Sequence, residues 1–255
     1  MKVAILAGGL GTRLSEETTV KPKPMVEVGG KPILWHIMNI YAAYGYKEFV
    51  IALGYKGEII KDYFLNYHYY SRSLTVQLKT GNVKIHNDQG EDWTVHLLDT
   101  GLDSSTGGRV KKVAEFIGNE AFMMTYGDGV SNINIHNLVN YHRQQGRLAT
   151  VTAVRPPARF GGLGLNENFV SYFTEKPQAG EGWINGGYFV LEPEIANYIP
   201  DYVTPWEALP MEKLVTEGQL AAYQHNDFWQ CMDTLRDVNQ LEKLWQDGTA
   251  PWKIW

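Results

Sequence analysis

The chain has 255 residues and a mass of 28.9 kDa, and its 44% hydrophobic and 20% charged residues indicate a folded globular protein rather than a mainly disordered one. Its net charge of −5 excludes non-specific binding to nucleic acid through the phosphate backbone. The absence of a long apolar stretch excludes a membrane span, and the single cysteine, Cys231, excludes an internal disulfide, so we expect a cytoplasmic protein.

Short apolar runs alternate with segments of helical periodicity along most of the chain, which indicates a largely parallel α/β sheet. In chain order we expect strand 3–7, helix 33–41, strand 49–53, helix 59–64, helix 110–116, strand 122–126, helix 135–142, strand 149–154 and strand 188–191. The expected fold is a Rossmann-like, mostly parallel mixed sheet flanked by helices.

Two segments depart from this rhythm. Residues 74–98 alternate between apolar and polar side chains around a turn-rich stretch, which predicts a hairpin-like insertion or a sheet edge, and a further hairpin is expected over 164–173. No repeat or linker divides the chain. We therefore expect one domain over 1–255, in which 1–130 mainly binds nucleotide and 131–205 mainly binds a sugar phosphate.

The C-terminal extension, 206–255, is expected to be helical and contains five of the eight tryptophans: Trp206, Trp229, Trp245, Trp252 and Trp255. They could simply cap the core. Tryptophans that cannot all be buried locally often pack on a partner subunit, and we favour this second interpretation.

The strongest motif is the glycine-rich turn Leu-Ala-Gly-Gly-Leu-Gly-Thr-Arg at 6–13, directly after the first expected strand. Its glycines let backbone N–H groups approach a phosphate chain closely. The turn is neither a Walker A loop nor a full dinucleotide fingerprint, because Leu14 stands where the third glycine would be. On glycine spacing alone, an ordinary tight turn fits equally well. Arg13, Lys21 and Lys23 supply cations nearby, the lysines on a proline-stiffened segment, and these favour phosphate binding.

Two isolated aspartates follow later in the chain. Asp128 lies between two glycines at the carboxyl end of an expected strand, where α/β sheets bind ligands. Asp233 lies in an apolar segment before a helix that we expect to begin near Leu235. Two carboxylates plus phosphate oxygens suit Mg²⁺. From spacing alone, however, we expect Asp233 to be the N-cap of that helix, with metal binding as the alternative.

Groups that a sugar phosphate would need also occur, namely Glu175 and Lys176 after the second hairpin, and Asn185 and Gly186 before a strand. Each one alone is an ordinary turn residue. The histidines show no metal-like spacing, and no Gly-x-Ser-x-Gly segment supports a serine hydrolase.

Taken together, these segments resemble the sugar-phosphate nucleotidyltransferase family over essentially the whole chain. The glycine-rich turn and Lys-Pro-Lys-Pro-Met at 21–25 are similar to the family signature. Thr-Gly-Gly-Arg at 106–109 and Asp-Thr-Leu-Arg-Asp at 233–237 resemble its cytidylyl branch. The Gln and the Gly-Thr/Leu-Ala segment with which other branches read their base are missing, and Cys231 stands where the family would have proline.

The resemblance implies a role for each matching residue. It implies that the triphosphate of CTP is bound by Leu6, Gly8, Gly9, Gly11, Thr12, Arg13 and Lys23. It places Thr106, Gly107, Gly108 and Arg109 at the nucleotide base. It assigns the sugar phosphate to Tyr126, Gly127, Asp128, Glu175, Lys176, Asn185 and Gly186. Mg²⁺ would be held by Asp128 and Asp233, and catalysis would depend on Lys23, Arg13 and Asp128.

The implied reaction joins CTP and α-D-glucose 1-phosphate into CDP-glucose and pyrophosphate, with Mg²⁺ as cofactor, in a trimer-based homo-oligomer that supplies dideoxy sugars for a surface polysaccharide. A phosphate monoester has its second pKa at roughly 6, so the nucleophile is already ionised and no general base or covalent intermediate is required. The same reaction with UTP, dTTP or another sugar 1-phosphate stays open.

Two other classes fit the residues less well. A glycosyltransferase would carry Asp-x-Asp, whereas Asp128 is followed by Gly129 and Val130. A non-catalytic nucleotide-sugar sensor would be expected to have lost Arg13, Lys23 or one of the aspartates, and all are present.

Overall fold

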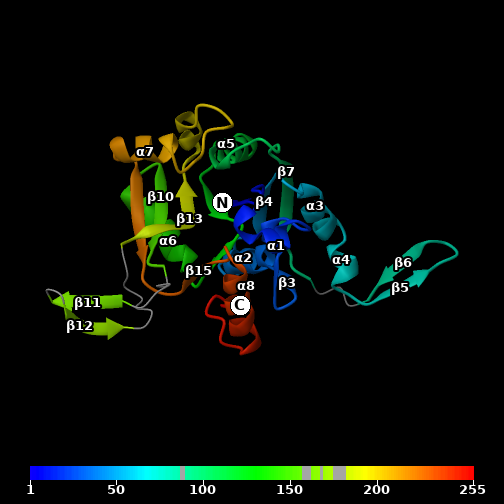
Figure 1. Ribbon diagram of the computed structural model, residues 1–255. Helices are drawn as coiled ribbons and strands as arrows, with labels where there is room; N and C mark the ends of the chain where they lie inside the picture. Colours follow the sequence, from blue (N-terminus) through cyan, green and yellow to red (C-terminus); the bar gives the residue numbers. More distant parts are fainter. Residues whose placement is uncertain (87–89, 157–161, 167–168, 175–181) are drawn as a thin grey trace.

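A seven-stranded sheet lies at the centre of the part of the chain that is described (Figure 1). The computed structural model describes residues 1–86, 90–156, 162–166, 169–174 and 182–255. The strands of the sheet are β1 (Val3–Leu6), β4 (Glu48–Leu53), β7 (Thr94–Asp99), β8 (Phe122–Tyr126), β10 (Ala149–Val154), β13 (Ile184–Leu191) and β14 (Leu220–His225). Their order is β14-β10-β13-β8-β1-β4-β7, and only β13 runs antiparallel to its neighbours. The expected mostly parallel mixed sheet is confirmed.

Helices cover both faces of the sheet, which gives three layers (Figure 1). One face packs against α2 (Ile33–Ala42), α3 (Gly57–Leu65), α6 (Ile135–Gln145) and α8 (Leu235–Gln246). The other face packs against α5 (Thr106–Ile117), the 3-10 helix η3 (Pro193–Tyr198) and α7 (Leu209–Thr216). Strand β1 shows why both faces are covered: its alternate residues point to the two cores and all four are buried.

Helix α5 begins at Thr106, four residues before the expected start at 110, because Ser105 caps it and accepts the backbone N–H of Gly108. Its first turn contains two glycines, which the helical pattern alone did not favour. The backbone of 202–206 crosses directly over this turn. A Cβ on Gly107 would lie 2.3 Å from the Thr204 carbonyl oxygen, and one on Gly108 would lie 1.9 Å from that of Tyr202.

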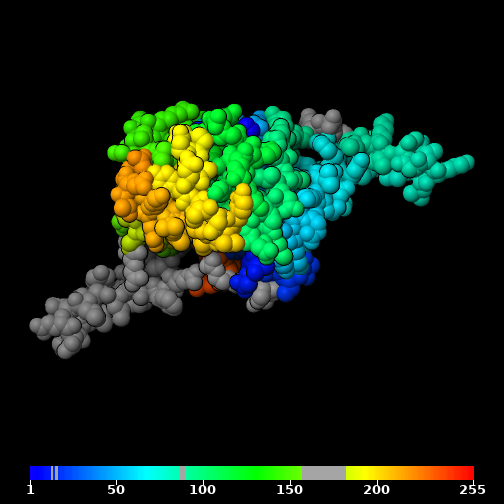
Figure 2. All heavy atoms as spheres, turned by 90° about the horizontal axis from the view of Figure 1, so that it is seen from above, coloured from blue at the N-terminus to red at the C-terminus, as the bar shows by residue number. Residues whose placement is uncertain are grey.

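The two unusual segments both contain hairpins. Strand β5 (Leu74–Gln77) pairs with β6 (Asn82–Ile85), and this hairpin projects from the body of the molecule in both views (Figures 1 and 2). The next alternating run is β7, the edge strand of the central sheet, so 74–98 holds an insertion and an edge. Strands β11 (Gly162–Asn166) and β12 (Phe169–Thr174) form the second expected hairpin.

Eight short elements complete the described part of the chain. They are η1 (Thr12–Leu14), α1 (Ser15–Thr18), η2 (Lys23–Met25), β2 (Glu27–Val28), β3 (Lys31–Pro32), α4 (Tyr67–Tyr70), β9 (Gly129–Ser131) and β15 (Trp229–Cys231). Strand β15 pairs with β9, so the C-terminal segment returns to the residues that follow β8. In the described part of the chain, no helix is long and apolar enough to cross a bilayer.

The tryptophans of the C-terminal extension serve this chain's own core more than expected. Trp206 and Trp252 are fully buried, Trp206 beside Phe189 and Trp252 stacked on Phe228 at 5.7 Å between ring centroids. For these two, the interpretation that they pack on a partner subunit is wrong, because the chain folds back and provides enough apolar surface itself. Trp255 is 38% exposed.

Candidate active site

The candidate site lies where the strand order reverses. From β1 the sheet grows towards β4 and β7, and the chain then returns through α5 to β8 on the other side of β1. The loops that leave β1 and β8 therefore diverge, and open α/β sheets bind ligands in such a crevice. The glycine-rich turn follows β1 and Asp128 follows β8, so the fold brings the two motifs together.

Two cavities meet at this point. The larger, of about 680 Å³, is lined by Leu6–Thr12, Lys23, Pro24, Leu102, Ser104, Ser105, Thr106, Arg109, Tyr126, Gly127, Asp128, Asn185 and Glu207. The smaller, of about 190 Å³, is lined by Thr125, Tyr126, Asp128, Gly129, Asn185–Tyr188, Trp229, Cys231 and Asp233. Tyr126, Asp128 and Asn185 belong to both linings, so a ligand in one cavity can reach a ligand in the other at these residues.

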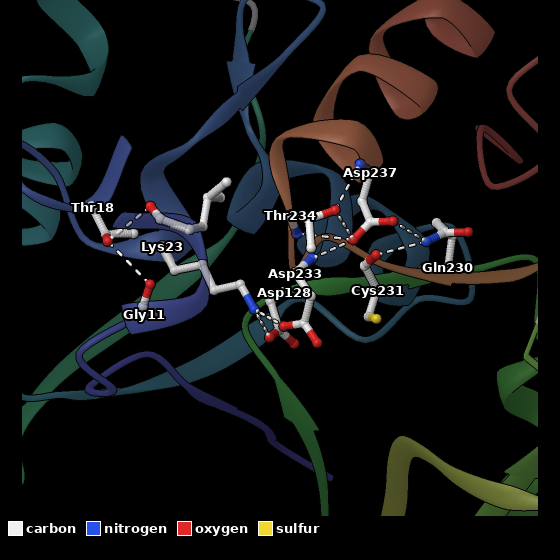
Figure 3. Close-up of polar contacts among 10 residues, drawn as sticks. Gly11, Thr18, Lys23, Asp128, Gln230, Cys231, Asp233, Thr234 and Asp237 are labelled. Carbon is white, nitrogen blue, oxygen red and sulfur yellow. Dashed lines mark hydrogen bonds and ion pairs between the residues drawn. The ribbon is translucent and has the colours of Figure 1, made fainter. Parts of the chain in front are cut away.

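Lys23 and the two predicted metal aspartates form one cluster, which we call the lysine wall (Figure 3). The Lys23 ammonium donates to Asp128 Oδ2 at 2.6 Å and also to Asp233 Oδ1. Lys23 and Asp233 are each 8% exposed. Burial opposes the charge on Lys23, but the two carboxylates outweigh it and raise the pKa of Lys23 above its usual value. The lysine is therefore held as a cation between two anions.

The predicted N-cap assignment of Asp233 is wrong. Thr234 caps α8, and Asp237 completes a capping box with it. Asp237 Oδ2 accepts the backbone N–H groups of Asp233 and Thr234 at 3.0 and 2.9 Å, so the cap fixes the backbone of Asp233 and leaves its carboxylate for Lys23 (Figure 3). The sequence pattern could not separate the two neighbours, because both Asp and Thr are good N-caps.

The lysine wall also fits a divalent cation. Mg²⁺ is commonly bound through one or two carboxylates together with substrate phosphates. Asp128, which lines both cavities, and Asp233, which lines the smaller one, provide such a pair. No group of three or more His, Cys, Asp or Glu side chains suited to a metal occurs among the described residues. The donor set therefore matches a cation that substrate oxygens would complete.

The glycine-rich turn is held by the guanidinium of Arg109. Arg109 Nη2 donates to the Gly8 carbonyl at 2.9 Å, and Nη1 donates to the carbonyls of Leu53 and Gly101, each at 2.9 Å. Arg109 is only 4% exposed. A Cβ on Gly8 would lie 2.3 Å from its Cζ, so residue 8 has to be glycine for the guanidinium to fit.

Further along the turn, Thr18 donates its hydroxyl to the carbonyls of Gly11, at 3.1 Å, and Leu14, at 2.9 Å. Gly11 has φ +65°, a left-handed conformation that favours glycine. Thr12 and Arg13 lie on η1, and the side chain of Arg13 is outside the described part of the chain. Lys21, by contrast, forms a surface pair with Glu27 at 3.5 Å and does not line either cavity.

Of the residues expected at the base, Thr106 and Arg109 line the larger cavity, whereas Gly107 and Gly108 face the backbone of 202–206 instead. Glu207, which no sequence motif indicated, lies beside Thr106. Glu207 accepts the Thr106 hydroxyl at 2.6 Å and the Tyr126 hydroxyl at 2.5 Å, and Asn185 Nδ2 donates to the Tyr126 oxygen at 3.2 Å. No local motif surrounds Trp206-Glu207, so the only sequence signal for Glu207 was its place in the C-terminal extension.

Tyr126 keeps its proton in this arrangement. Burial, and after it the charge of Glu207, raise the pKa of Tyr126 far above its usual range. The hydroxyl therefore donates to Glu207 and accepts from Asn185. We call Ser104, Ser105, Thr106 and Glu207 the hydroxyl wall of the larger cavity.

The smaller cavity contains some of the expected sugar-phosphate residues. Asn185 and Gly186 line it, and Trp229 Nε1 donates to the Gly186 carbonyl at 2.7 Å. Gly127 lines only the larger cavity, where a Cβ would lie 2.8 Å from the Leu6 carbonyl oxygen. Glu175 and Lys176 lie outside the described residues. Burial, followed by the charge of Asp233, raises the pKa of the Cys231 thiol to about 12, so this cavity residue stays protonated.

Comparison with known proteins identifies the class. The profile of the nucleotidyl transferase family matches residues 2–249. A solved structure of HddC from Yersinia pseudotuberculosis, in complex with GMP-PN, has a TM-score of 0.70 at 22% identity and covers 96% of this chain and 99% of that one. A UDP-glucose pyrophosphorylase complexed with UDP-glucose has a TM-score of 0.69 at 17% identity, with 97% and 98% covered. The chain therefore belongs to the nucleotidyl transferase family, as its motifs predict.

Within that family, the chain is similar over its full length to glucose-1-phosphate cytidylyltransferases. It is 51% identical to that of Salmonella typhimurium over 256 residues, with 100% of both chains covered. It is 45% identical, again over the full length of both chains, to a probable glucose-1-phosphate cytidylyltransferase of Bacillus subtilis. A UTP–glucose-1-phosphate uridylyltransferase of Synechocystis is 27% identical and matches 96% of this chain over 62% of its own length.

Proposed function

We propose that the protein catalyses the formation of CDP-glucose and pyrophosphate from CTP and α-D-glucose 1-phosphate. The observation that carries this proposal is the junction of two cavities at a buried lysine held between two carboxylates. The full-length similarity to cytidylyltransferases supports the choice of substrates.

The two substrates divide between the cavities. CTP occupies the larger one, where the glycine-rich turn and its backbone N–H groups receive the triphosphate. The glucose phosphate occupies the smaller one, beside Asn185 and Gly186. Residues 1–130 thus supply most of the nucleotide side. The described lining of the sugar side comes from all three parts of the chain, with Asn185–Tyr188 from 131–205 and Trp229, Cys231 and Asp233 from 206–255.

Catalysis then follows from position and charge. A phosphate oxygen of glucose 1-phosphate attacks the α-phosphorus of CTP in line, the new P–O bond forms, and the bond to the β-phosphate breaks to release pyrophosphate. The nucleophile is ionised at neutral pH, so the chain has no proton to remove. Lys23, already a cation at the junction, neutralises charge that develops on the transferring phosphate, and the rigid turn keeps two mutually repelling anions aligned.

Mg²⁺, held by Asp128 and Asp233, would add charge neutralisation at the phosphate oxygens. The chain's own contribution is to hold both carboxylates on one side of the junction. The Asp237 cap sets the backbone of Asp233, and the Gly127–Leu6 hydrogen bond at 3.1 Å sets the loop that carries Asp128.

The decisive assay is pyrophosphate release with Mg²⁺ and α-D-glucose 1-phosphate, run in parallel with CTP, UTP, dTTP, ATP and GTP. We expect release with CTP, and at most weak release with UTP. Release with another nucleotide alone would keep the family and contradict the cytidylyl assignment. A folded protein that binds CTP but releases no pyrophosphate with any sugar 1-phosphate would favour a nucleotide-sugar sensor.

We also propose a homo-oligomer, trimer-based as the resemblance implies. We propose that it acts in the cytoplasm, which suits a chain with a single cysteine. The projecting β5–β6 hairpin supports it because its apolar side chains face solvent: Leu78 is 93% exposed and Val76 is 49% exposed. Light scattering after gel filtration tests this. Leu78→Asp should lower the measured mass without lowering the melting temperature of the subunit, and a monomeric wild type would contradict it.

A further inference from the structure

We infer that Glu207 determines which pyrimidine nucleotide the larger cavity accepts, by accepting a hydrogen bond from the amino group that cytosine carries and uracil lacks. The inference rests on the proposed function for its reaction, and it adds to the residues that the resemblance places at the base one side chain that separates cytosine from uracil.

Glu207 lies on the nucleotide side of the site. It lines the larger cavity and not the smaller one, so it belongs to the nucleotide side of the site. The lysine wall and the glycine-rich turn supply the cation and the N–H groups that a triphosphate needs. Of the remaining polar lining, Arg109, Tyr126 and Asn185 donate hydrogen bonds to other groups of the protein. The rest is the hydroxyl wall, whose only carboxylate among the described residues is Glu207.

The hydroxyl wall has few hydrogen-bond donors left for a ligand. Each hydroxyl of the wall, and that of Tyr126, donates its proton to another group of the protein. Thr106 donates to Glu207, because an ionised carboxylate can only accept, and its oxygen in turn accepts the Trp206 backbone N–H at 2.9 Å. The acceptors are the Thr100 carbonyl for Ser104, the Thr204 carbonyl for Ser105, and Glu207 for Thr106 and Tyr126. The side chains of this wall therefore present lone pairs to a ligand.

The Glu207 carboxylate can accept more hydrogen bonds than the protein gives it. An ionised carboxylate accepts about four hydrogen bonds, and Tyr126 and Thr106 account for one on each oxygen of Glu207. These two bonds fix its orientation and leave acceptor sites towards the cavity. Carboxylates accept from the N4 amino group of cytosine, whereas uracil has a keto oxygen at that position, which a carboxylate repels. The wall thus favours CTP over UTP.

The test compares wild type with Glu207→Gln, whose amide can donate to a keto oxygen. We would measure kcat/KM for CTP and UTP by pyrophosphate release, and Kd for each nucleotide by calorimetry without the sugar phosphate. The preference for CTP over UTP, measured as the ratio of their kcat/KM values and as the ratio of their affinities, should fall roughly tenfold. The amide no longer repels the keto oxygen of uracil, and it attracts the amino group of cytosine less than a charged carboxylate does. Tyr126→Phe, which removes one hydrogen bond but keeps the carboxylate, should change this ratio much less.

A matched control is Glu217→Gln. Glu217 also accepts a tyrosine hydroxyl, that of Tyr198 at 2.5 Å, but lies on the surface and lines neither cavity. It should leave rates, affinities and their ratio unchanged. If Glu207→Gln weakens both nucleotides equally, or if wild type binds UTP as tightly as CTP, the inference is wrong. A wild type that binds CTP more tightly than UTP but releases no pyrophosphate would contradict the proposed reaction. The role of Glu207 would then be decided by the Kd values of wild type and Glu207→Gln for the two nucleotides.

Discussion

The two walls of the nucleotide cavity hold their charges in opposite ways. In the lysine wall, Lys23 and Asp233 are almost fully buried, and each charge is paired directly with another. In the hydroxyl wall, Glu207 is exposed to solvent and accepts hydrogen bonds from neutral hydroxyls. A buried charge without a partner is costly, so the lysine wall is fixed before substrate arrives. An exposed carboxylate can exchange water for a ligand donor, which suits selection rather than catalysis.

The elements behind the two sides differ as well. Behind the lysine wall, α8 is anchored to the β2–β3 turn: Gly29 donates its backbone N–H to Glu242 at 2.6 Å, and His36 contacts Trp252. Behind the glycine-rich turn, a single guanidinium, that of Arg109, binds the backbone carbonyls of Gly8, of Leu53 at the end of β4, and of Gly101. The lysine wall therefore depends on a C-terminal helix, and the glycine-rich turn depends on the side chain of Arg109. Different substitutions should disturb each of them.

The largest effect is expected for Lys23→Met. The variant removes the only described cation of the lysine wall, and loss of such a transition-state contact typically lowers kcat by about 10³. It also leaves Asp128 and Asp233 facing each other without their cation, so Mg²⁺ should raise its melting temperature more than it raises that of wild type. Steady-state kinetics and thermal melts with and without Mg²⁺ measure both effects.

Lys21→Met is the control for this substitution, because Lys21 stands two residues away on the same stiff segment but pairs only at the surface. It should keep near-normal kcat. A folded Lys23→Met protein with wild-type kcat would remove Lys23 from catalysis, and a melting temperature insensitive to Mg²⁺ would contradict a cation site at the two aspartates.

The second largest effect is a loss of folding stability at acid pH, caused by His36, which helps to anchor α8. His36 is fully buried, its Nε2 bonds to the Val28 carbonyl at 2.8 Å, and its Nδ1 accepts from Trp252. Burial lowers the pKa of His36 to about 4. The unfolded chain, with a pKa near 6.5, then binds more protons between these values, so stability is full above about pH 6.5 and declines towards pH 4. The decline should reach about 3 kcal/mol.

Urea unfolding at pH 7, 5.5 and 4.5 measures this decline. His36→Gln cannot titrate, so it should be less stable than wild type at pH 7 but should lose less stability on acidification. His68→Gln, at an exposed position, should keep the wild-type slope. Equal slopes for wild type and His36→Gln would show that other groups cause the acid sensitivity.

The sequence predicted the sheet well because β1, β4 and β10 are buried apolar strands whose pattern needs no knowledge of their neighbours. It also predicted Lys23 and Asp128 as site residues, since each lies in a distinctive local motif. What it could not predict depends on contacts between distant segments. Asp233 pairs with Lys23 across 210 residues, and Glu207 bonds to Thr106 across 101.

The sequence also did not predict which groups pack against its glycines. Gly107 and Gly108 were expected at the base, but their small size is explained by the chain of 202–206 packing on α5. Gly8 was expected to approach a phosphate, and it also makes space for Arg109. A glycine in a sequence indicates a close approach, whereas the identity of the approaching group comes only from the fold.

The smallest effect distinguishes two adjacent glycines of the turn. Gly8→Ala would place a Cβ 2.3 Å from Arg109 Cζ, so the guanidinium must move and the protein should lose about 2 kcal/mol of stability. Gly9→Ala meets nothing within 4 Å and should melt as wild type does. If the turn wraps the triphosphate, however, Gly9→Ala should still weaken CTP binding, because its methyl group would lie where the phosphate chain approaches the backbone.

Thermal melts measure the stability of the two variants, and calorimetric titration measures their affinity for CTP. Wild-type affinity in Gly9→Ala would place the triphosphate away from this turn, and wild-type stability in Gly8→Ala would show that Arg109 does not depend on the missing side chain.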